Sequence, residues 1–319
     1  MGGRTDVDDD PVLLEVKGGV AVISLNRPDV HNLMNEAVDA LFFRYLDLLR
    51  SDRDVRVVVW RGNGPSFSTG RDMAELIGET NGNGNGHGHG PGPGPGHAAG
   101  HGAGHGAAPG PGYAPGADEH SHGFGRRRAA RRGYGASDFE VLERGHWSAR
   151  LLYDFPVPII CALKGWSLGS ALERALLCDI RVAGEGARLA LSSLDHGVIP
   201  DSAGVAKLFE IGGTGLALDL ALTGRRVDAA EALRLGLVSQ VVADHELDEV
   251  VADLAHGIAE RPPLVTRLVR EHVQALAAPG VRGTLGRELV GQTMVLASHD
   301  LREHRQSRID DREPRYERR

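Results

Sequence analysis

A repeated order of short strand, small-residue turn and helix constrains the fold more than any other feature of this sequence. Residues 159–163 are apolar and follow Pro158, a glycine-rich turn spans residues 165–169, a helical pattern runs to Leu177, and residues 179–182 have the pattern of a further strand. Another strand at residues 55–60 leads through a small-residue turn into a short helix at residues 72–77. Strands that alternate with helices in this way predict an α/β fold with crossover connections.

The flanking segments extend this pattern. Residues 12–16 and 20–25 predict a β-hairpin around a Lys-Gly-Gly turn, and residues 34–50 have the apolar spacing of a helix. From Asp201 onward the chain is mostly helical, and apolar stripes predict helical segments at residues 264–276 and 281–308.

A low-complexity segment interrupts the pattern between residues 79 and 136. It holds 19 of the 44 glycines, and it ends in an arginine-rich run at residues 126–132. Because it has too few apolar residues to offset the entropy lost on ordering, we expect it to be disordered. Without these 58 residues, 261 of the 319 remain, enough for one large core. The sequence therefore predicts a core of residues 1–78 and 137–255, a disordered insert at 79–136 and a C-terminal helical region at 256–319.

Composition and charge exclude several classes of protein. No run of about 18 apolar residues exists, so no contact with a membrane is predicted. The net charge of −7 divides into +2 for residues 79–136 and −9 for the remainder, which argues against a nucleic-acid partner. Cys161 and Cys178 are the only cysteines, and their apolar surroundings predict a reducing, cytoplasmic location. Five histidines spaced by glycine and proline form no preorganised metal site, so we expect no dedicated metal site and at most weak, adventitious Zn²⁺ or Ni²⁺ binding at His87, His89, His97, His101 and His105.

Two turns that precede helices are the candidate functional segments. Residues 66–72 read Ser-Phe-Ser-Thr-Gly-Arg-Asp and residues 165–173 read Gly-Trp-Ser-Leu-Gly-Ser-Ala-Leu-Glu, each at the end of a strand. The first N–H groups of a helix have no partner within it, and two such groups from two turns could bind one developing oxyanion. Both segments could equally be ordinary connections between a strand and a helix.

Acidic residues lie close to these turns. Glu173 falls in the first turn of the second helix, where its carboxyl group could transfer a proton at the carbon next to a bound carbonyl. The spacing of Ser170 and Glu173 also matches a capping box, which is a structural motif. Asp195 and Asp201 follow in loops, and Asp201 could simply be a helix N-cap.

The run Gly165-x-Ser167-x-Gly169 also matches the nucleophile elbow of α/β-hydrolases. Asp201 and His256 follow in the chain order that a catalytic triad of that fold requires. An HGGG-type oxyanion segment is absent from the sequence, which argues against a serine hydrolase but leaves it as a remote alternative.

Taken in chain order, these segments resemble the crotonase (enoyl-CoA hydratase/isomerase) superfamily over about residues 12–77 and 137–319. The resemblance implies a spiral of repeated ββα units and C-terminal helices that pack between subunits, in a homotrimer or a hexamer of paired trimers. It implies an acyl-CoA thioester as substrate, so that coenzyme A belongs to the substrate and no separate cofactor is needed. The matching motifs are Asn26-Arg27-Pro28 with Asn32 and Asn35, residues 67–72, residues 158–165, Leu168-Gly169 with Glu173, Cys178-Asp179, residues 222–225 and residues 232–238.

The resemblance also assigns binding roles. The backbone N–H groups of Arg71 and Ser170 would form the oxyanion hole that stabilises a thioester enolate. Arg71, Asp72, Met73 and Ala74 would line the coenzyme A site.

The catalytic residues implied by the resemblance are Glu173 and Asp201. Glu173 matches the first of the two glutamates of a hydratase, whereas Ser193 stands at the position of the second. Asp201 stands where dienoyl-CoA isomerases and the ring isomerase of the phenylacetate pathway carry a catalytic aspartate. The sequence therefore predicts an enoyl-CoA hydratase/isomerase, with a dienoyl-type double-bond or ring isomerase and a non-catalytic acyl-CoA-binding protein as alternatives. If the two acids share protons, burial and mutual repulsion should separate their pKa values.

Overall fold

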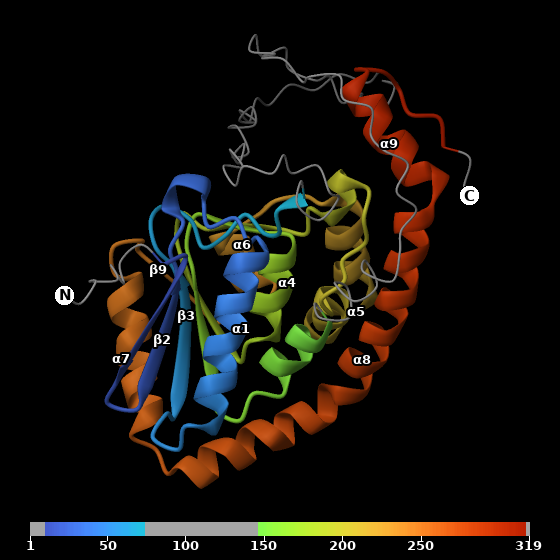
Figure 1. The fold of residues 1–319 in the computed structure, drawn as a ribbon. Coiled ribbons are helices and arrows are strands. Elements are labelled where there is room, and N and C mark those ends of the chain that lie inside the picture. The colour runs from blue at the N-terminus through green and yellow to red at the C-terminus, as the bar shows by residue number, and fades with distance from the viewer. Residues whose placement is uncertain (1–9, 74–145, 317–319) are drawn as a thin grey trace, which may run out of the picture. The chain divides into compact units, whose positions relative to one another are not determined.

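A computed structural model of the chain describes residues 10–73 and 146–316 (Figure 1). Within these residues the larger sheet has six strands in the order β1-β2-β3-β4-β6-β9. The predicted hairpin is confirmed: β1 (Val12–Lys17) and β2 (Val20–Leu25) are antiparallel. The other neighbours pair in parallel through β3 (Val57–Gly62), β4 (Ile159–Leu163), β6 (Ile180–Gly184) and β9 (Gln240–Val242). Parallel neighbours need crossover connections, so the predicted α/β class is confirmed.

Helices cover both faces of this sheet, and the alternation of side chains along the strands explains how. On β3, Val57 and Val59 face α7 (Leu247–Ala259), whereas Val58 and Trp60 face the core that includes α1 (Glu36–Ser51) and α4 (Ser170–Leu177). A strand buried on both sides reads as a continuous apolar run, which is what residues 57–60 show.

A second, smaller sheet lies beside the first, and it corrects one prediction. The segment 165–169 was expected to be only a turn, but it contains the strand β5 (Trp166–Leu168). β5 pairs in parallel with β7 (Arg188–Ala190), which pairs antiparallel with β8 (Val227–Asp228). A strand of three residues is too short to show a period in the sequence, and only its pairing with β7 reveals it.

The rest of the described chain forms several shorter helices and one long one. They are the 3-10 turns η2 (Pro28–Val30) and η3 (Ser193–His196), a helical segment at residues 146–153, and the helices α5 (Gly204–Thr223), α6 (Ala229–Arg234), α8 (Pro263–Ala297) and α9 (His299–Ile309). The two predicted C-terminal segments are therefore divided elsewhere than expected. α8 runs for 35 residues, and the break falls at Ser298, whose side chain caps α9 by accepting a hydrogen bond from the N–H of Leu301.

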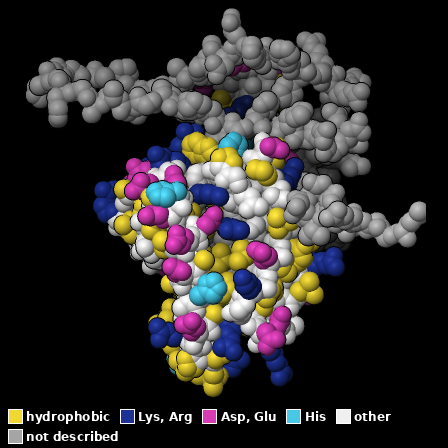
Figure 2. Space-filling view, turned by 90° about the vertical axis from the view of Figure 1, so that its left-hand side faces the viewer, with side chains coloured by type: hydrophobic (Ala, Val, Ile, Leu, Met, Phe, Trp, Pro, Cys, Tyr) yellow, Lys and Arg dark blue, Asp and Glu magenta, His cyan; other side chains and the backbone are white. Residues whose placement is uncertain are grey.

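The first half of α8 exposes several apolar side chains. Hydrophobic side chains are visible at the lower end of Figure 2, the end at which α8 begins in Figure 1. In the part of the chain described here, no helix is both long enough and apolar enough to cross a membrane. The exposed apolar residues in the first half of α8 include Leu264, Val265, Val269, Val273 and Leu276.

Candidate active site

Asn32 holds the loop that follows β3. Its side chain is 1% exposed, and its Nδ2 donates hydrogen bonds to the carbonyl oxygens of Asn63 (2.9 Å) and Ser66 (2.8 Å). Its Oδ1 accepts a hydrogen bond from the N–H of Arg27 at 2.8 Å. A Cβ at Gly62 would lie 2.7 Å from Nδ2 of Asn32, so the glycine is needed for this approach. The Asn26-Arg27-Pro28 motif thus has a structural role: with Asn32 it fixes the path of the chain toward Arg71.

Arg71 lies at a parallel bridge to Met34. The N–H of Met34 donates to the carbonyl oxygen of Gly70 and the N–H of Asp72 donates to that of Met34, both at 2.8 Å. Because both neighbours of Arg71 bond to Met34, the N–H of Arg71 itself points to the other side of the strand. The Arg71 guanidinium lies 3.6 Å from the carboxylate of Asp39, which fixes its side chain to α1.

Ser170 begins α4 directly beside this loop. Gly70 (φ 90°) and Gly169 (φ 51°) both adopt left-handed backbone conformations that favour glycine. A Cβ at Gly70 would lie 2.7 Å from the carbonyl oxygen of Leu168 and 3.5 Å from the backbone nitrogen of Ser170. The structure therefore brings the two predicted turns into direct contact. The N–H of Ser170, in the first turn of α4, has no acceptor within its own helix.

Glu173 is buried against the beginning of α5. Its side chain is 1% exposed, and Oε2 accepts a hydrogen bond from the N–H of Ser202 at 2.9 Å. The Ser193 hydroxyl donates to Oε1 at 3.5 Å. A Cβ at Gly204 would lie 2.5 Å from Cγ of Glu173, so glycine alone permits this contact. The carboxyl group therefore sits between α4 and the N-terminus of α5.

The capping-box interpretation of Ser170 and Glu173 is wrong. The N-cap of α4 is Gly169, which has no side chain to accept a hydrogen bond. The Ser170 hydroxyl is buried and has no hydrogen-bond partner among the described residues. The Glu173 carboxyl group is directed to α5 instead, which leaves it available for chemistry.

Burial and, after it, the nearby carboxylate of Asp201 together raise the pKa of Glu173 from 4.5 to about 8, while the N–H of Ser202 acts in the opposite direction. At pH 7 a group with this pKa is protonated in about nine molecules of ten. The Glu173 carboxyl group therefore carries a proton at neutral pH. Such a shift, caused by burial and a specific charged neighbour, is typical of functional sites.

Asp201 lies half-buried in the loop that precedes α5. The alternative that it is the N-cap of this helix is wrong, because the N-cap is Ala203, which has a left-handed conformation (φ 60°). The electrostatic effect of Asp201 on Glu173 shows that the structure brings the two predicted acids together.

Two further residues of the site were missed by the sequence analysis. His146, in the helical segment 146–153, is 7% exposed, and its Nε2 is buried with no partner in the described part of the chain. Burial lowers the pKa of His146, and the carboxylate of Asp201 opposes this shift. Glu288, on α8, is 6% exposed and accepts a hydrogen bond from the N–H of Ala203 at 2.9 Å. Burial raises the pKa of Glu288 from 4.5 to about 7, although the bond from Ala203 opposes the shift.

A signal for Glu288 exists in the sequence, and it lies in the periodicity of α8. The helix buries residues 281, 285, 288, 292 and 296 along one stripe. Two of them, Glu288 and Gln292, are polar among apolar neighbours. Polar residues on a buried helical stripe need partners, which marks both of them as candidates. No comparable pattern in the sequence singles out His146.

A buried ion pair supports α4 next to Glu173. Arg174 is 2% exposed, and its guanidinium contacts both carboxylate oxygens of Asp39 at 2.6 and 3.0 Å. It also lies 5.2 Å from the ring centroid of Phe43. Although burial opposes ionisation, the Arg174 guanidinium lowers the pKa of Asp39. The pair joins α1 to α4, while the adjacent Glu173 contacts α5.

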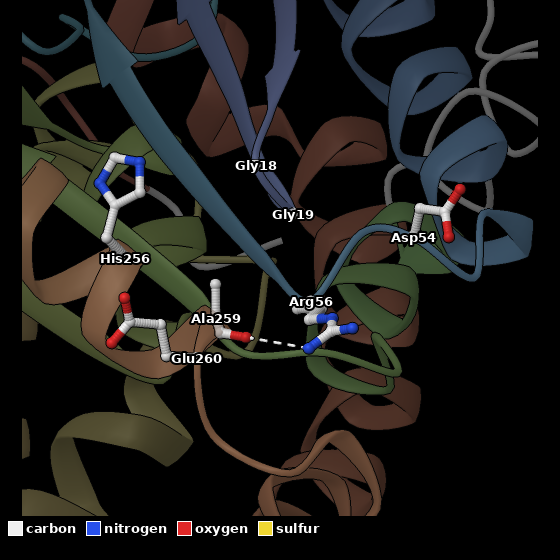
Figure 3. Close-up of a pocket in the computed structure, with 7 residues that line it drawn as sticks. All are labelled: Gly18, Gly19, Asp54, Arg56, His256, Ala259 and Glu260. Carbon is white, nitrogen blue, oxygen red and sulfur yellow. Dashed lines mark hydrogen bonds between the residues drawn. The ribbon is translucent and has the colours of Figure 1, made fainter.

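The structure does not assemble the serine-hydrolase triad. Ser167 is fully buried in β5, and its hydroxyl has no hydrogen-bond partner among residues 10–73 and 146–316. His256 lies exposed on α7, where its Nδ1 is 2.8 Å from the carbonyl oxygen of Ala252. It lines a surface pocket (Figure 3) together with Gly18, Gly19, Asp54, Arg56, Ala259 and Glu260.

Glu173, Asp201 and Glu288 form what we call the acid cluster. None of them lines the pocket of Figure 3. Its main polar contact is a hydrogen bond of 3.3 Å from Nη1 of Arg56 to the carbonyl oxygen of Ala259, at the C-terminal end of α7. A cation at that position satisfies the last carbonyl groups of a helix, which is a structural role.

The expected coenzyme A residues are placed only in part. Met73 packs against a small apolar cluster of Val198, Leu296 and Leu301, and Ala74 lies outside the described residues. The predicted insert at 79–136 also lies outside them. Within residues 10–73 and 146–316, no group of three His, Cys, Asp or Glu side chains is arranged to hold a metal ion.

Comparison with known proteins gives the class to which this fold and site belong. The chain belongs to the enoyl-CoA hydratase/isomerase (crotonase) family, because the sequence model of that family matches residues 15–88 and 121–319. The interruption of the match, from residue 89 to 120, falls within the predicted insert.

The relatives include two bacterial proteins. A protein of Bacillus subtilis (strain 168) described as a probable enoyl-CoA hydratase is 28% identical over 307 residues, 96% of this chain and 98% of that one. The short-chain-enoyl-CoA hydratase of Clostridium acetobutylicum is 27% identical over 263 residues, 82% of this chain and 80% of that one.

Solved structures agree on the fold. The crystal structure of an enoyl-CoA hydratase/isomerase from Pseudoalteromonas atlantica T6c superposes with a TM-score of 0.71 at 22% identity, covering 96% of this chain and 99% of that one. The predicted crotonase-type fold, with two sheets and C-terminal helices, is thereby confirmed.

Proposed function

We propose that this chain is an enoyl-CoA hydratase/isomerase in which Glu173 and Asp201 transfer protons to and from a thioester enolate. The observation that carries the proposal is the buried carboxyl group of Glu173, which lies three residues after Ser170 and has its pKa raised by burial and by Asp201. The N–H groups of Arg71 and Ser170 belong to touching segments, and we propose that both donate to the thioester oxygen. Donors fixed in advance at a developing oxyanion are worth about 2.7–4 kcal/mol each in transition-state stabilisation.

In hydration, a water oxygen bonds to C3 of the enoyl thioester and a proton bonds to C2. Glu173 donates the proton to C2, and Asp201 accepts one proton from the attacking water, so one proton enters and one leaves. Transfer between the two neighbouring carboxyl groups then restores the starting state. The N–H of Ser202 stabilises the Glu173 carboxylate while it is charged, at a bond length of 2.9 Å.

The second candidate is a double-bond or ring isomerase of the dienoyl-CoA type. Ser193 stands where a hydratase has its second glutamate, and its hydroxyl can donate to Glu173 but cannot take up a proton from water at neutral pH. In this reaction one acid removes a proton from the substrate and the other returns one at a different carbon. A non-catalytic acyl-CoA-binding protein is less well supported, because binding alone does not need a buried acid with a raised pKa.

The test is a pair of assays, hydration of crotonyl-CoA and isomerisation of a 3-enoyl-CoA, applied to wild type, Glu173→Gln and Asp201→Asn. We expect each substitution to lower the rate about 10²–10⁴-fold, the usual contribution of a general acid or base. Asp195→Asn is the matched control, because Asp195 is an exposed aspartate in the same region and should leave the rate unchanged. Unchanged rates in both active-site variants would contradict the assignment. Binding of acyl-CoA without turnover of any enoyl-CoA would favour the binding protein.

We further propose that the protein works as a homotrimer, or as a hexamer of paired trimers, in the cytoplasm. The support is the row of apolar side chains exposed along the first half of α8, from Leu264 to Leu276, which a subunit contact would cover. The two cysteines are buried and free, as in a reducing compartment. Light scattering coupled to size-exclusion chromatography tests the assembly, and a monomer at micromolar concentration would contradict it.

A further inference from the structure

The C-terminal helix α8 holds the loop that carries Asp201. Oε1 of Gln292 accepts a hydrogen bond from the N–H of Ile199 at 3.1 Å, and Oε2 of Glu288 accepts one from the N–H of Ala203 at 2.9 Å. Residues 288 and 292 are one helical turn apart, so they present neighbouring side chains on one face of the helix. α8 packs against α5 in this region (Figure 1). The two bonds therefore fix the loop on both sides of Asp201.

Glu173 and Glu288 accept hydrogen bonds from two consecutive backbone N–H groups. The N–H of Ser202 donates to Glu173, and the next N–H along the chain, that of Ala203, donates to Glu288, both at 2.9 Å. Ala203 adopts a left-handed conformation (φ 60°), which separates the directions of these two N–H groups. Oε1 of Glu288 is buried and has no hydrogen-bond partner within the described residues. A buried carboxylate oxygen without a donor disfavours the charged form, and burial raises the pKa of Glu288 to about 7. Glu288 is therefore mostly ionised near pH 8, where Glu173 loses its proton.

We propose that Glu288 is a positioning residue of the active site, whose carboxyl group, held by the N–H of Ala203, keeps Glu173 in the protonated form that donates to the substrate. This proposal rests on the proposed function, in which Glu173 is the proton donor. Glu288 is not expected to touch the substrate, and it acts through the charge that it adds to the acid cluster.

Titratable groups from several elements face this cluster, and Arg71 and Arg150 act on His146 at its edge. Asp201 lies in the loop before α5, and His146 lies near it on the helical segment 146–153. Arg174, next to Glu173 on α4, is committed to its ion pair with α1. Glu173 and Glu288 each have a pKa raised first by burial and further by Asp201, and Glu288 adds to the shift of Glu173. Carboxylates this close cannot all be ionised, so removing one makes the others easier to ionise.

The test compares Glu288→Gln with Gln292→Ala. The glutamine at 288 keeps an oxygen for the N–H of Ala203 but removes the charge. Gln292→Ala is the matched control, because it removes the neighbouring bond to the same loop without removing a charge. The first readout is the alkaline limb of the turnover profile, which reports the loss of the Glu173 proton. The second is the infrared band of the protonated Glu173 carboxyl, assigned by its absence in Glu173→Gln and titrated with pH, which does not depend on turnover.

We expect Glu288→Gln to move both midpoints to lower pH by about half a unit or more, so that the protonated fraction of Glu173 at pH 8 falls by roughly a factor of two. Gln292→Ala should leave both midpoints unchanged. Glu288→Asp, which keeps the charge, should retain the wild-type infrared midpoint and provides a second variant if Glu288→Gln does not fold.

An infrared midpoint that is the same in Glu288→Gln as in wild type would overturn the proposal. An equal shift in Glu288→Gln and Gln292→Ala would also overturn it, because the effect would then come from loop structure alone. If the infrared midpoint shifts but no enoyl-CoA is turned over, the positioning of Glu173 stands and only the proposed function fails.

Discussion

Replacing Glu173 by glutamine should stabilise the folded protein by an amount that grows with pH. The glutamate is 1% exposed, and burial raises its pKa from 4.5 to about 8. In the unfolded chain the same group ionises near its ordinary value. Between these two values the folded state keeps a proton that the unfolded state has released. Stability is therefore lost as the pH rises through this range, by about 1.4 kcal/mol per pH unit.

The magnitude follows from the width of this interval. Below pH 4.5 both states are protonated and Glu173 imposes no such cost, and above pH 8 both are ionised and the cost is constant. Between pH 5 and pH 8 the wild type should lose on the order of 3–4 kcal/mol of unfolding free energy relative to Glu173→Gln, which has no proton to release. The substitution that lowers turnover should therefore raise stability, a trade-off typical of active sites.

Urea unfolding at pH 5, 6, 7 and 8 measures the effect, at one protein concentration because subunit association would also stabilise the fold. Ser193→Ala is a suitable control, since it removes the hydroxyl 3.5 Å from Oε1 of Glu173 but keeps the carboxyl group. It should follow the wild-type dependence on pH. A stability difference between Glu173→Gln and wild type that stays constant within about 1 kcal/mol from pH 5 to pH 8 would refute the reasoning.

Three other substitutions test the geometry of the site. Gly204→Ala places a Cβ 2.5 Å from Cγ of Glu173, so the carboxyl group must move, and we expect turnover to fall about 100-fold in the assay with crotonyl-CoA; full activity would show that the contact is unimportant. Asp39→Ala leaves the buried guanidinium of Arg174 without its carboxylate and should lower the unfolding free energy by about 3–5 kcal/mol in urea titrations, whereas a loss below about 1 kcal/mol would mean that the pair does not stabilise the fold. Ser167→Ala removes a buried hydroxyl and should leave turnover unchanged; labelling of Ser167 in wild type by a fluorophosphonate probe would instead support a nucleophilic serine.

The parallel sheet and the two glycine-rich segments could be predicted because local residue types determine them. Strand β3 is an apolar run bounded by turn residues, and its neighbours in the sheet have the same character. The left-handed conformations of Gly70 and Gly169 are ones that few other residues adopt, so the glycines themselves mark the turns. Strand β5 could not be predicted, because it exists only through its pairing with β7.

The acid cluster was predictable only in part, because its members come from distant segments. Glu173 and Asp201 were found from turn position and family resemblance, and the structure places them in electrostatic contact. Glu288 is separated from Glu173 by 115 positions along the chain. Only the packing of α8 against α5 brings Glu288 to the N–H of Ala203, next to the N–H that binds Glu173. The capping roles expected as alternatives for Glu173 and Asp201 were wrong for a common reason. Gly169 is the N-cap of α4 and Ala203 is the N-cap of α5, so neither acid caps its helix.

The most direct measurement is hydrogen exchange at C2 of a saturated acyl-CoA in D₂O, followed by proton NMR. Exchange requires only that the enolate be stabilised and that a carboxylate of the site accept the C2 proton and return a deuteron from solvent, so it applies equally to a hydratase and to an isomerase. We predict that the wild-type protein exchanges the C2 hydrogens of butyryl-CoA and that Glu173→Gln slows the exchange at least about 100-fold. No exchange in wild type, or equal exchange in Glu173→Gln, would contradict the assignment of Glu173 as the residue that moves the proton.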